Sequence, residues 1–149
     1  MILQTKNFGE LELDESKIIE FPEALPGFPQ LKKFVLFHKK DENGEEMHTF
    51  VFLQSVEDGD IAFTLLDVSH YLEDYALDFH EKELDVIGGF SQATCWIYNI
   101  TIVPDKLEDM RTNLKAPIII NTETKKAKQV VMNGDYDVRF HIYKSLKEK

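Results

Sequence analysis

Apolar and polar side chains alternate with a period of two residues along much of this chain. In residues 96–103 the large apolar side chains take every second position: Trp96, Tyr98, Ile100 and Ile102. Residues 136–142 repeat the pattern with Tyr136, Val138, Phe140 and Ile142. Successive side chains of a β-strand point to opposite faces of its sheet, so this period predicts half-buried antiparallel strands. We expect both segments to turn these apolar side chains to the core, with Asn99 and Thr101 on the opposite face.

Turn residues separate the expected strands. Asn133 and Gly134 tolerate the positive φ of a two-residue hairpin and predict one between residues 128–132 and 136–143. Residues 42–45, which include Gly44, predict a longer connection between strands at residues 34–38 and 47–53. Further strands are expected at residues 2–6, 8–13, 17–21, 61–66 and 117–120.

Helix is expected in few places. Residues 71–79 place apolar side chains at helical spacing after Ser69 as a possible N-cap, residues 81–87 extend the pattern, and Gly88 would stop it. Residues 105–110 allow one more short turn. Many strands with few helices predict a mainly β fold, an antiparallel barrel-like roll with one or two short helices, because closure hides sheet edges.

Residues 112–121 combine a proline with an aliphatic run. Pro117 has no N–H and biases Ala116 away from helix, so a strand is expected to begin at Pro117. Asn113 and Asn121 flank this segment as turn residues whose side chains can satisfy local backbone groups.

The 149 residues fit one domain, which we place at residues 1–143, with a frayed tail at residues 144–149. No apolar run approaches the roughly 18 to 20 residues that cross a bilayer, and no secretion signal is recognisable at the N-terminus. The single cysteine, Cys95, is expected in the core and suits a reducing compartment. These features predict a cytoplasmic protein with no membrane contact.

Acidic residues dominate the charge. The formal net charge of −10 disfavours direct nucleic-acid binding, because phosphate backbones are held mainly by Lys and Arg. Residues 67–85, the acidic segment, hold seven acids against one base, whereas residues 106–128 hold six bases against three acids. Such asymmetry can orient the approach of a charged partner, and a basic protein is the expected one.

The histidines are the first candidates for metal or acid–base chemistry. His38 and His48 could sit across one hairpin, but no carboxylate or cysteine accompanies them at a site-like spacing. His70, Asp74 and Asp78 would share one helical face, where a capping or solvated role is expected. Glycine-rich phosphate loops, nucleophile elbows and paired cysteines are missing from the sequence. We therefore predict no enzyme, and no catalytic, cofactor-binding or metal-binding residues.

Two other functions stay open on the sequence. One is a small β-barrel hydrolase or isomerase with His38, His48 or His70 as base, which requires titratable groups converging in a pocket. The other is a small-ligand barrel, which requires an unfilled interior.

Protein binding is the function that the remaining features favour. The rigid turn at residues 24–29 could hold Leu25 and Phe28 outward, or these side chains could fold back and plug the barrel. Tyr71 and Tyr75 pair a large contact area with a polar tip inside the acidic segment, a composition enriched at interfaces. The predicted partner-binding residues are Leu25, Phe28, Tyr71, Glu73, Asp74, Tyr75, Asp78, Asn113 and Lys115.

Three blocks in series resemble the FliW family of flagellar assembly factors. They are residues 21–28 (FPEALPGF), residues 52–58 (FLQSVED), and residues 112–121 followed by Gln129-Val130-Val131 and Tyr136. Two positions depart from the family pattern: Ala24 stands where glycine is common, and residues 66–69 (LDVS) replace a more usual Asp-Pro step.

The resemblance implies a non-enzymatic cytoplasmic regulator with a mainly β, roll-like fold and no cofactor. Family members bind flagellin and also CsrA, a small RNA-binding protein that represses flagellin translation, and FliW freed by flagellin export captures CsrA. We expect a monomer whose acidic segment takes CsrA, with the turn at Leu25 and Phe28 beside it.

Overall fold

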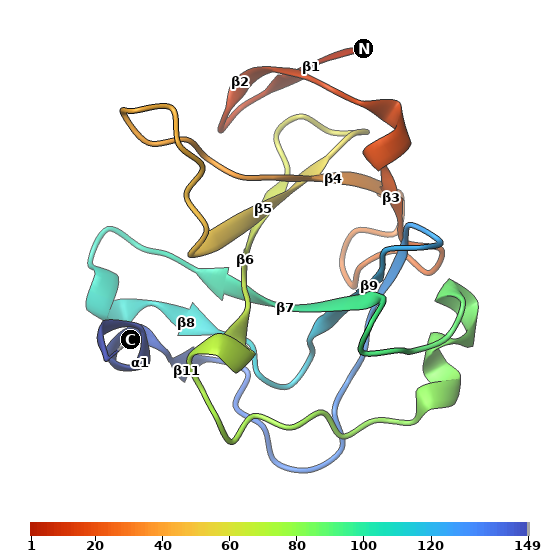
Figure 1. Ribbon diagram of the computed structural model, residues 1–149, viewed down its shortest axis with the longest axis vertical. Helices are drawn as coiled ribbons and strands as arrows, with labels where there is room; N and C mark the ends of the chain where they lie inside the picture. The colour runs from red at the N-terminus through yellow and green to blue at the C-terminus, as the bar shows by residue number, and fades with distance from the viewer. Residues whose placement is uncertain (149) are drawn as a thin grey trace.

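The computed structural model describes residues 1–148, and Figure 1 shows strands that circle a central space. Within these residues, seven strands form a closed ring in which each is hydrogen-bonded to the next. In ring order they are β7 (Cys95–Ile102), β6 (Ala62–Leu66), β5 (Phe50–Ser55), β4 (Lys33–Phe37), β3 (Ile19–Glu20), β10 (Lys126–Gln129) and β9 (Ile118–Asn121). The expected barrel-like roll is confirmed.

One pairing in the ring departs from the antiparallel pattern. β7 is long enough to pair antiparallel with both β6 and β9, through Leu65↔Ile100 and Cys95↔Asn121 among others. β10 runs antiparallel to β9 but parallel to β3, which it meets at Lys126↔Glu20.

Smaller elements surround the ring. β8 (Arg111–Thr112) and β11 (Phe140–His141) extend the sheet outward from β7, and β1 (Ile2–Thr5) pairs with β2 (Gly9–Glu12) as a separate ribbon at the top of Figure 1. The helical elements are η1 (Glu15–Lys17), η2 (Val68–His70), η3 (Glu81–Ile87), η4 (Leu107–Asp109) and α1 (Tyr143–Lys147). Within residues 1–148, no helix has the length and apolar character needed to cross a membrane.

Large buried side chains fill the ring. The main cluster includes Phe21, Phe34, Leu53, Leu65 and Ile118, none of them with measurable exposure. These side chains leave no room for a ligand where they pack, which argues against the small-ligand barrel at that place, whereas a hollow of about 460 Å³ borders the same cluster at Ile19 and Ile120. A second cluster lies under β8 and α1, and a third, which contains the buried Cys95, lies between η3 and β9.

Local turn chemistry follows the sequence in three places. β4 and β5 pair antiparallel across the predicted connection, where Gly44 has a φ of 80°. The Asn113 side chain accepts hydrogen bonds from the backbone N–H groups of Lys115 and Ala116, both at 3.0 Å. The Asn121 side chain likewise accepts from Glu123 and Thr124. Both asparagines are therefore the turn residues expected around β9.

The expected orientation of β7 is confirmed in part, because Tyr98 and Ile100 pack against the main core cluster, but the ends of this face are exposed and the opposite face is buried as well. Trp96 and Ile102 are 52% and 64% exposed, whereas Asn99 and Thr101 are buried. Both buried side chains have polar partners: Asn99 Nδ2 donates to Asn113 O at 2.8 Å, and the Thr101 hydroxyl lies 2.9 Å from that of Thr112. Hydrogen bonds to β8 and the loop after it thus allow the polar face to be covered.

The predicted hairpin at Asn133-Gly134 is also wrong, because β10 and β11 have other partners. The chain after β10 continues beside the segment that precedes β9: Val130 N donates to Pro117 O at 3.0 Å and Met132 N to Lys115 O at 2.8 Å. In the predicted strand at residues 136–143, β11 contains two residues, and Val138 is 58% exposed.

Two helical expectations need correction. Residues 71–79 are irregular, so His70, Asp74 and Asp78 do not share a helical face; backbone and side-chain contacts to residues 132–136 override the helical spacing. η3 forms as expected but as a 3-10 helix, and Gly88 ends it with a φ of 98°.

The tail also differs from expectation. Residues 143–147 form α1, because Ile142 is fully buried and Leu146 packs against the same cluster. Residue 149 of the predicted tail lies outside the described residues.

Candidate protein-binding groove

A groove of about 510 Å³ lies between the start of the acidic segment, the loop after β8 and the C-terminal helix. We call it the tyrosine groove. Its lining residues are Tyr71, Leu72, Glu73, Asp74, Tyr75, Leu114, Tyr136, Ser145 and Glu148. The three tyrosines bring apolar rings with polar tips, and the three carboxylates bring negative charge.

Tyr75 is anchored in the groove wall by two hydrogen bonds. Its hydroxyl donates to the backbone oxygen of Leu114 at 2.7 Å and accepts from Asn99 Nδ2 at 3.0 Å. Burial raises the pKa of the Tyr75 hydroxyl above its ordinary value, although the hydrogen bond from Asn99 acts in the opposite direction. The hydroxyl therefore stays protonated and donates throughout the physiological pH range.

Tyr136 completes the aromatic wall. Its ring meets that of Tyr75 edge to face, with centroids 6.0 Å apart, and its hydroxyl donates to the backbone oxygen of Ala76 at 3.0 Å. Asp78 is tied to the same loop, because its backbone oxygen accepts from Asn133 N at 2.7 Å. These contacts fix the irregular segment 71–79 against residues 132–136, which run beside it at the bottom of Figure 1. The groove is thus built on two segments that hold each other in place.

The chemistry of the groove suits a basic protein surface. Glu73 and Asp74 are exposed beside half-buried Tyr71 and Tyr75. Tyrosine rings supply a large contact area at low entropic cost and attract lysine and arginine side chains over their faces. Adjacent carboxylates accept hydrogen bonds from the same cations.

The structure brings some of the predicted binding residues together. Tyr71, Glu73, Asp74 and Tyr75 all line the groove. Asp78 is exposed beyond its rim, next to Asn133. The remaining predicted residues have structural contacts.

Asn113 and Lys115 flank the groove residue Leu114 but turn toward backbone groups. The Asn113 side chain caps its own turn. The Lys115 ammonium donates to the backbone oxygen of Gly134, so it links two loops rather than reaching into solvent.

Leu25 and Phe28 close the barrel. Leu25 is 3% exposed within the main core cluster, and the Phe28 ring packs edge to face on Phe63 with centroids 5.3 Å apart. Of the two arrangements that the sequence allowed, these side chains adopt the plug.

Sequence reasoning missed the exposed aromatic Trp96 and five groove residues, which are Leu72, Leu114, Tyr136, Ser145 and Glu148. Tyr136 was expected on a core strand, and Ser145 and Glu148 in a frayed tail. Trp96 was expected in the core but lines a separate hollow of about 460 Å³ with Ile19, Leu36, His38, Tyr98 and Ile120 among others. No signal in the sequence marks α1 as a groove wall, but the polar tip of Tyr136 is compatible with a surface position.

Two of the five histidines, His38 and His48, lie next to each other. The rings of His38 and His48 have centroids 5.3 Å apart, and Glu46 lies with them, which corrects the expectation that no carboxylate accompanies the pair. His70 packs edge to face against Tyr71, with centroids 5.0 Å apart.

Known proteins are similar to this chain in sequence and in fold. A family model described as FliW protein matches residues 2–142. The flagellar assembly factor FliW of Alkaliphilus metalliredigens is 33% identical, covering 99% of this chain and 90% of the relative. That of Carboxydothermus hydrogenoformans is 37% identical, covering 95% and 90%. A crystal structure of the flagellar assembly factor FliW superposes with a TM-score of 0.83 at 29% identity, covering 95% of this chain and 96% of the other. With most of its length matched in sequence and in fold, the chain belongs to the FliW family of flagellar assembly factors.

Proposed function

We propose that this chain is a cytoplasmic, non-enzymatic regulator that binds flagellin and, when free of flagellin, binds the RNA-binding repressor CsrA through the tyrosine groove. Capture of CsrA would relieve repression of flagellin synthesis. The observation that supports this most directly is the groove itself, in which tyrosine rings and carboxylates lie side by side in a protein of net charge −10.

Charge complementarity supports a basic partner. A negative surface steers a basic protein during encounter and raises the association rate, and salt screens this effect. Tyr71, Tyr75 and Tyr136 supply the short-range contacts that then slow dissociation. The two contributions predict that salt weakens CsrA binding mainly through the association rate.

The test exchanges charge inside the groove and at a matched site. Glu73→Lys with Asp74→Lys changes the net charge by +4 at the groove rim. Glu10→Lys with Glu12→Lys makes the same change on exposed positions of β2. We expect the groove variant to weaken CsrA binding on the order of tenfold, with most of the loss in the association rate, and the β2 variant to weaken it far less.

Titration calorimetry and surface-binding kinetics at two salt concentrations measure both variants, with circular dichroism as the folding control. If the two variants weaken CsrA binding equally, CsrA does not bind in the groove, and only the net charge of the protein affects its binding.

Adding flagellin tests whether flagellin and CsrA exclude each other from this protein. If flagellin and CsrA compete, adding flagellin to a preformed complex with CsrA releases free CsrA in size-exclusion chromatography. A stable complex of all three proteins would contradict the exchange, while leaving each binary interaction intact.

A further inference from the structure

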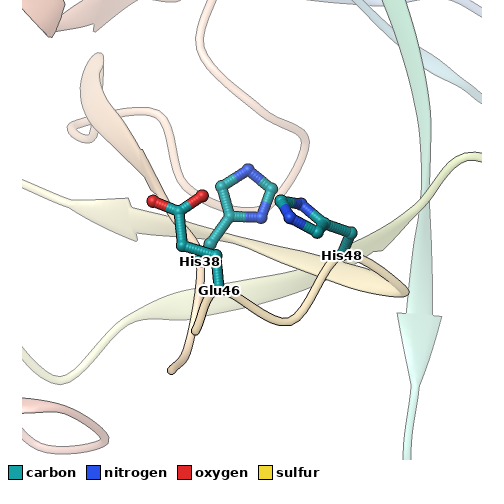
Figure 2. A group of neighbouring side chains, drawn as sticks. All are labelled: His38, Glu46 and His48. Carbon is teal, nitrogen blue, oxygen red and sulfur yellow. The ribbon is translucent and has the colours of Figure 1, made fainter. Parts of the chain in front are cut away.

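We propose that His38, Glu46 and His48 form a binding site for a divalent transition-metal ion of the zinc type. The three side chains each offer a ligand atom, and these atoms all lie within 4.8 Å of one another. Figure 2 shows the His38 imidazole between the Glu46 carboxylate and the His48 imidazole.

Hairpin register explains why residues of this kind meet. Beyond β4, Lys40 pairs antiparallel with Glu46, and Met47 N donates to Lys39 O at 2.7 Å. Continuing that register by two residues sets His38 opposite His48. Because side chains alternate along extended chain, Glu46 and His48 point to the same face, which is also the face of His38.

Buried polar chemistry at His38 gives an independent reason. Within residues 1–148, His38 Nδ1 is one of three buried side-chain nitrogen or oxygen atoms that lack a hydrogen-bond partner; the others belong to Gln54 and Asn99. A buried polar atom without a partner destabilises the folded state, because it has lost its hydrogen bonds to water. Coordination to a cation satisfies an imidazole nitrogen lone pair in the same way as a donated hydrogen bond.

The distances are compatible with coordination after a small side-chain adjustment. Ligand atoms bound to one tetrahedral zinc ion at about 2.0–2.1 Å lie about 3.3 Å apart. Glu46 and His48 are both exposed, so rotation of their side chains can close the present separation while half-buried His38 stays in place.

Ligand type and local charge select the class of ion. Two imidazoles with one carboxylate suit zinc, cobalt or nickel, whereas calcium and magnesium prefer oxygen ligands. The hairpin at residues 38–48 also carries four acids against two lysines, which favours a cation. Of these lysines, Lys39 extends over the rings of Phe8 and Phe52, at 5.7 and 5.5 Å from their centroids. Three protein ligands leave a fourth position for water or for a side chain of a binding partner.

The direct test is titration of the untagged full chain with zinc chloride after treatment with a chelator. We expect one ion per chain for the unchanged protein. His48→Ala and Glu46→Gln alter exposed side chains and leave β4 intact, and we expect them to weaken binding about 100-fold and about tenfold. His80→Ala and Glu42→Gln are matched controls, because both residues are exposed and lie outside the three-residue cluster. Magnesium and calcium should give no binding.

A second readout reports on the hairpin itself. Zinc that joins His38 to His48 should slow hydrogen exchange of the Met47 amide in the unchanged protein and not in His48→Ala. Cobalt in place of zinc should give the visible absorption of a tetrahedral site.

Three outcomes would overturn the site. The first is that the unchanged protein binds no zinc, and the second is that His48→Ala and Glu46→Gln each bind zinc as tightly as the unchanged protein does. The third outcome is loss of zinc binding in His70→Ala with retention in His38→Ala. The last would move the ion to the hollow that His48 and His70 share with Asp67.

Discussion

Ala24 adopts a backbone conformation that favours glycine. Its φ of 59° lies in the left-handed region. The left-handed conformation costs an L-residue with a Cβ about 1–2 kcal/mol, whereas glycine adopts it freely. The plug formed by Leu25 and Phe28 therefore begins at a strained residue.

Ala24→Gly should stabilise the protein. The relieved strain exceeds the added entropy of the unfolded chain, so we expect a gain of about 0.5 kcal/mol and a Tm higher by about 1–2 °C. Ala93→Gly is the control, because Ala93 is exposed in a turn without positive φ and its replacement should lower the Tm. Calorimetry that shows Ala24→Gly to be as destabilising as the control would contradict the strain.

Two tyrosines, Tyr75 and Tyr98, make the free energy of unfolding depend on pH in the alkaline range. Burial raises the pKa of Tyr75, and burial together with the negative charge of Asp67 raises the pKa of Tyr98. A pKa raised in the folded state means that the folded protein holds its proton more tightly than the unfolded chain. The stabilisation is thus complete below the unfolded value of about 10 and is lost as pH rises through the folded pKa.

The free energy of unfolding should accordingly fall above pH 10. In Tyr75→Phe with Tyr98→Phe, urea unfolding between pH 9 and 11 should give a flatter dependence than in the unchanged protein. A slope unchanged by the double substitution would assign the alkaline loss to other groups. Tyr75→Phe alone should cost about 1 kcal/mol at neutral pH, because it removes the hydrogen bond to Leu114 O.

At the scale of elements, the ribbon of β1 and β2 is joined to the ring at few points. Lys6 N donates to Gly59 O at 3.0 Å, and the Phe8 ring packs on Phe37 and Phe52 with centroids 4.8 and 5.0 Å away. Gly59 is essential for this approach, since a Cβ there would lie 2.0 Å from the backbone oxygen of Gln4.

Gly59→Ala should separate the ribbon from the ring. Contact with a backbone atom cannot be relieved by a side-chain rotation, so we expect a loss of about 1–3 kcal/mol. Hydrogen exchange should accelerate at the Lys6 amide while the amides of β5 stay protected. Asp60→Ala, an exposed neighbour, is the control. Equal protection of Lys6 in both variants would show that the ribbon tolerates the methyl group.

The elements also show which parts of the fold a sequence can predict. β4, β5, β6 and β9 are predictable because apolar runs and turn residues such as Gly44 and Asn121 agree with each other there. Residues 71–79 are not, because their helical spacing is overridden by hydrogen bonds to Asn133 and Tyr136, more than 50 residues away. The burial of the polar face of β7 is missed for a related reason, since partners on β8 and in the loop after it cover Asn99 and Thr101.

The candidate site divides in the same way. Tyr71, Glu73, Asp74 and Tyr75 are contiguous, so composition alone draws attention to them. Tyr136 and Glu148 reach the groove through the path of the chain after β10, which no local pattern specifies. His38, Glu46 and His48 meet through hairpin register, and the sequence does not reveal it because the register beyond Lys40 differs from that between β4 and β5.

The whole molecule carries a large excess of negative charge, with 27 acids against 17 bases. Such an excess repels itself in the compact state, and salt screens the repulsion. Lys128 and Glu23 form an ion pair at 2.9 Å. Because the Glu23 carboxylate is exposed, this pair stabilises the protein only slightly, and salt that screens it costs little stability.

Moderate salt should therefore stabilise the protein. We expect the Tm to rise between about 10 mM and 200 mM sodium chloride, where the screening length falls from roughly 30 Å to below 10 Å. Sucrose at matched osmolality controls for solvent exclusion. A Tm that falls with salt would show that specific ion pairs outweigh the repulsion.

The ring has a consequence for the order of synthesis and folding. Its closing contact joins Glu20 to Lys126, so β3 is made more than a hundred residues before its partner. A nascent chain on the ribosome that has not yet extended past β10 leaves one side of β3 and one side of β9 unpaired, and unpaired strand edges invite association with other chains. The barrel thus completes only when β10 has left the ribosomal tunnel, and until then its protection against aggregation depends on something other than its own fold.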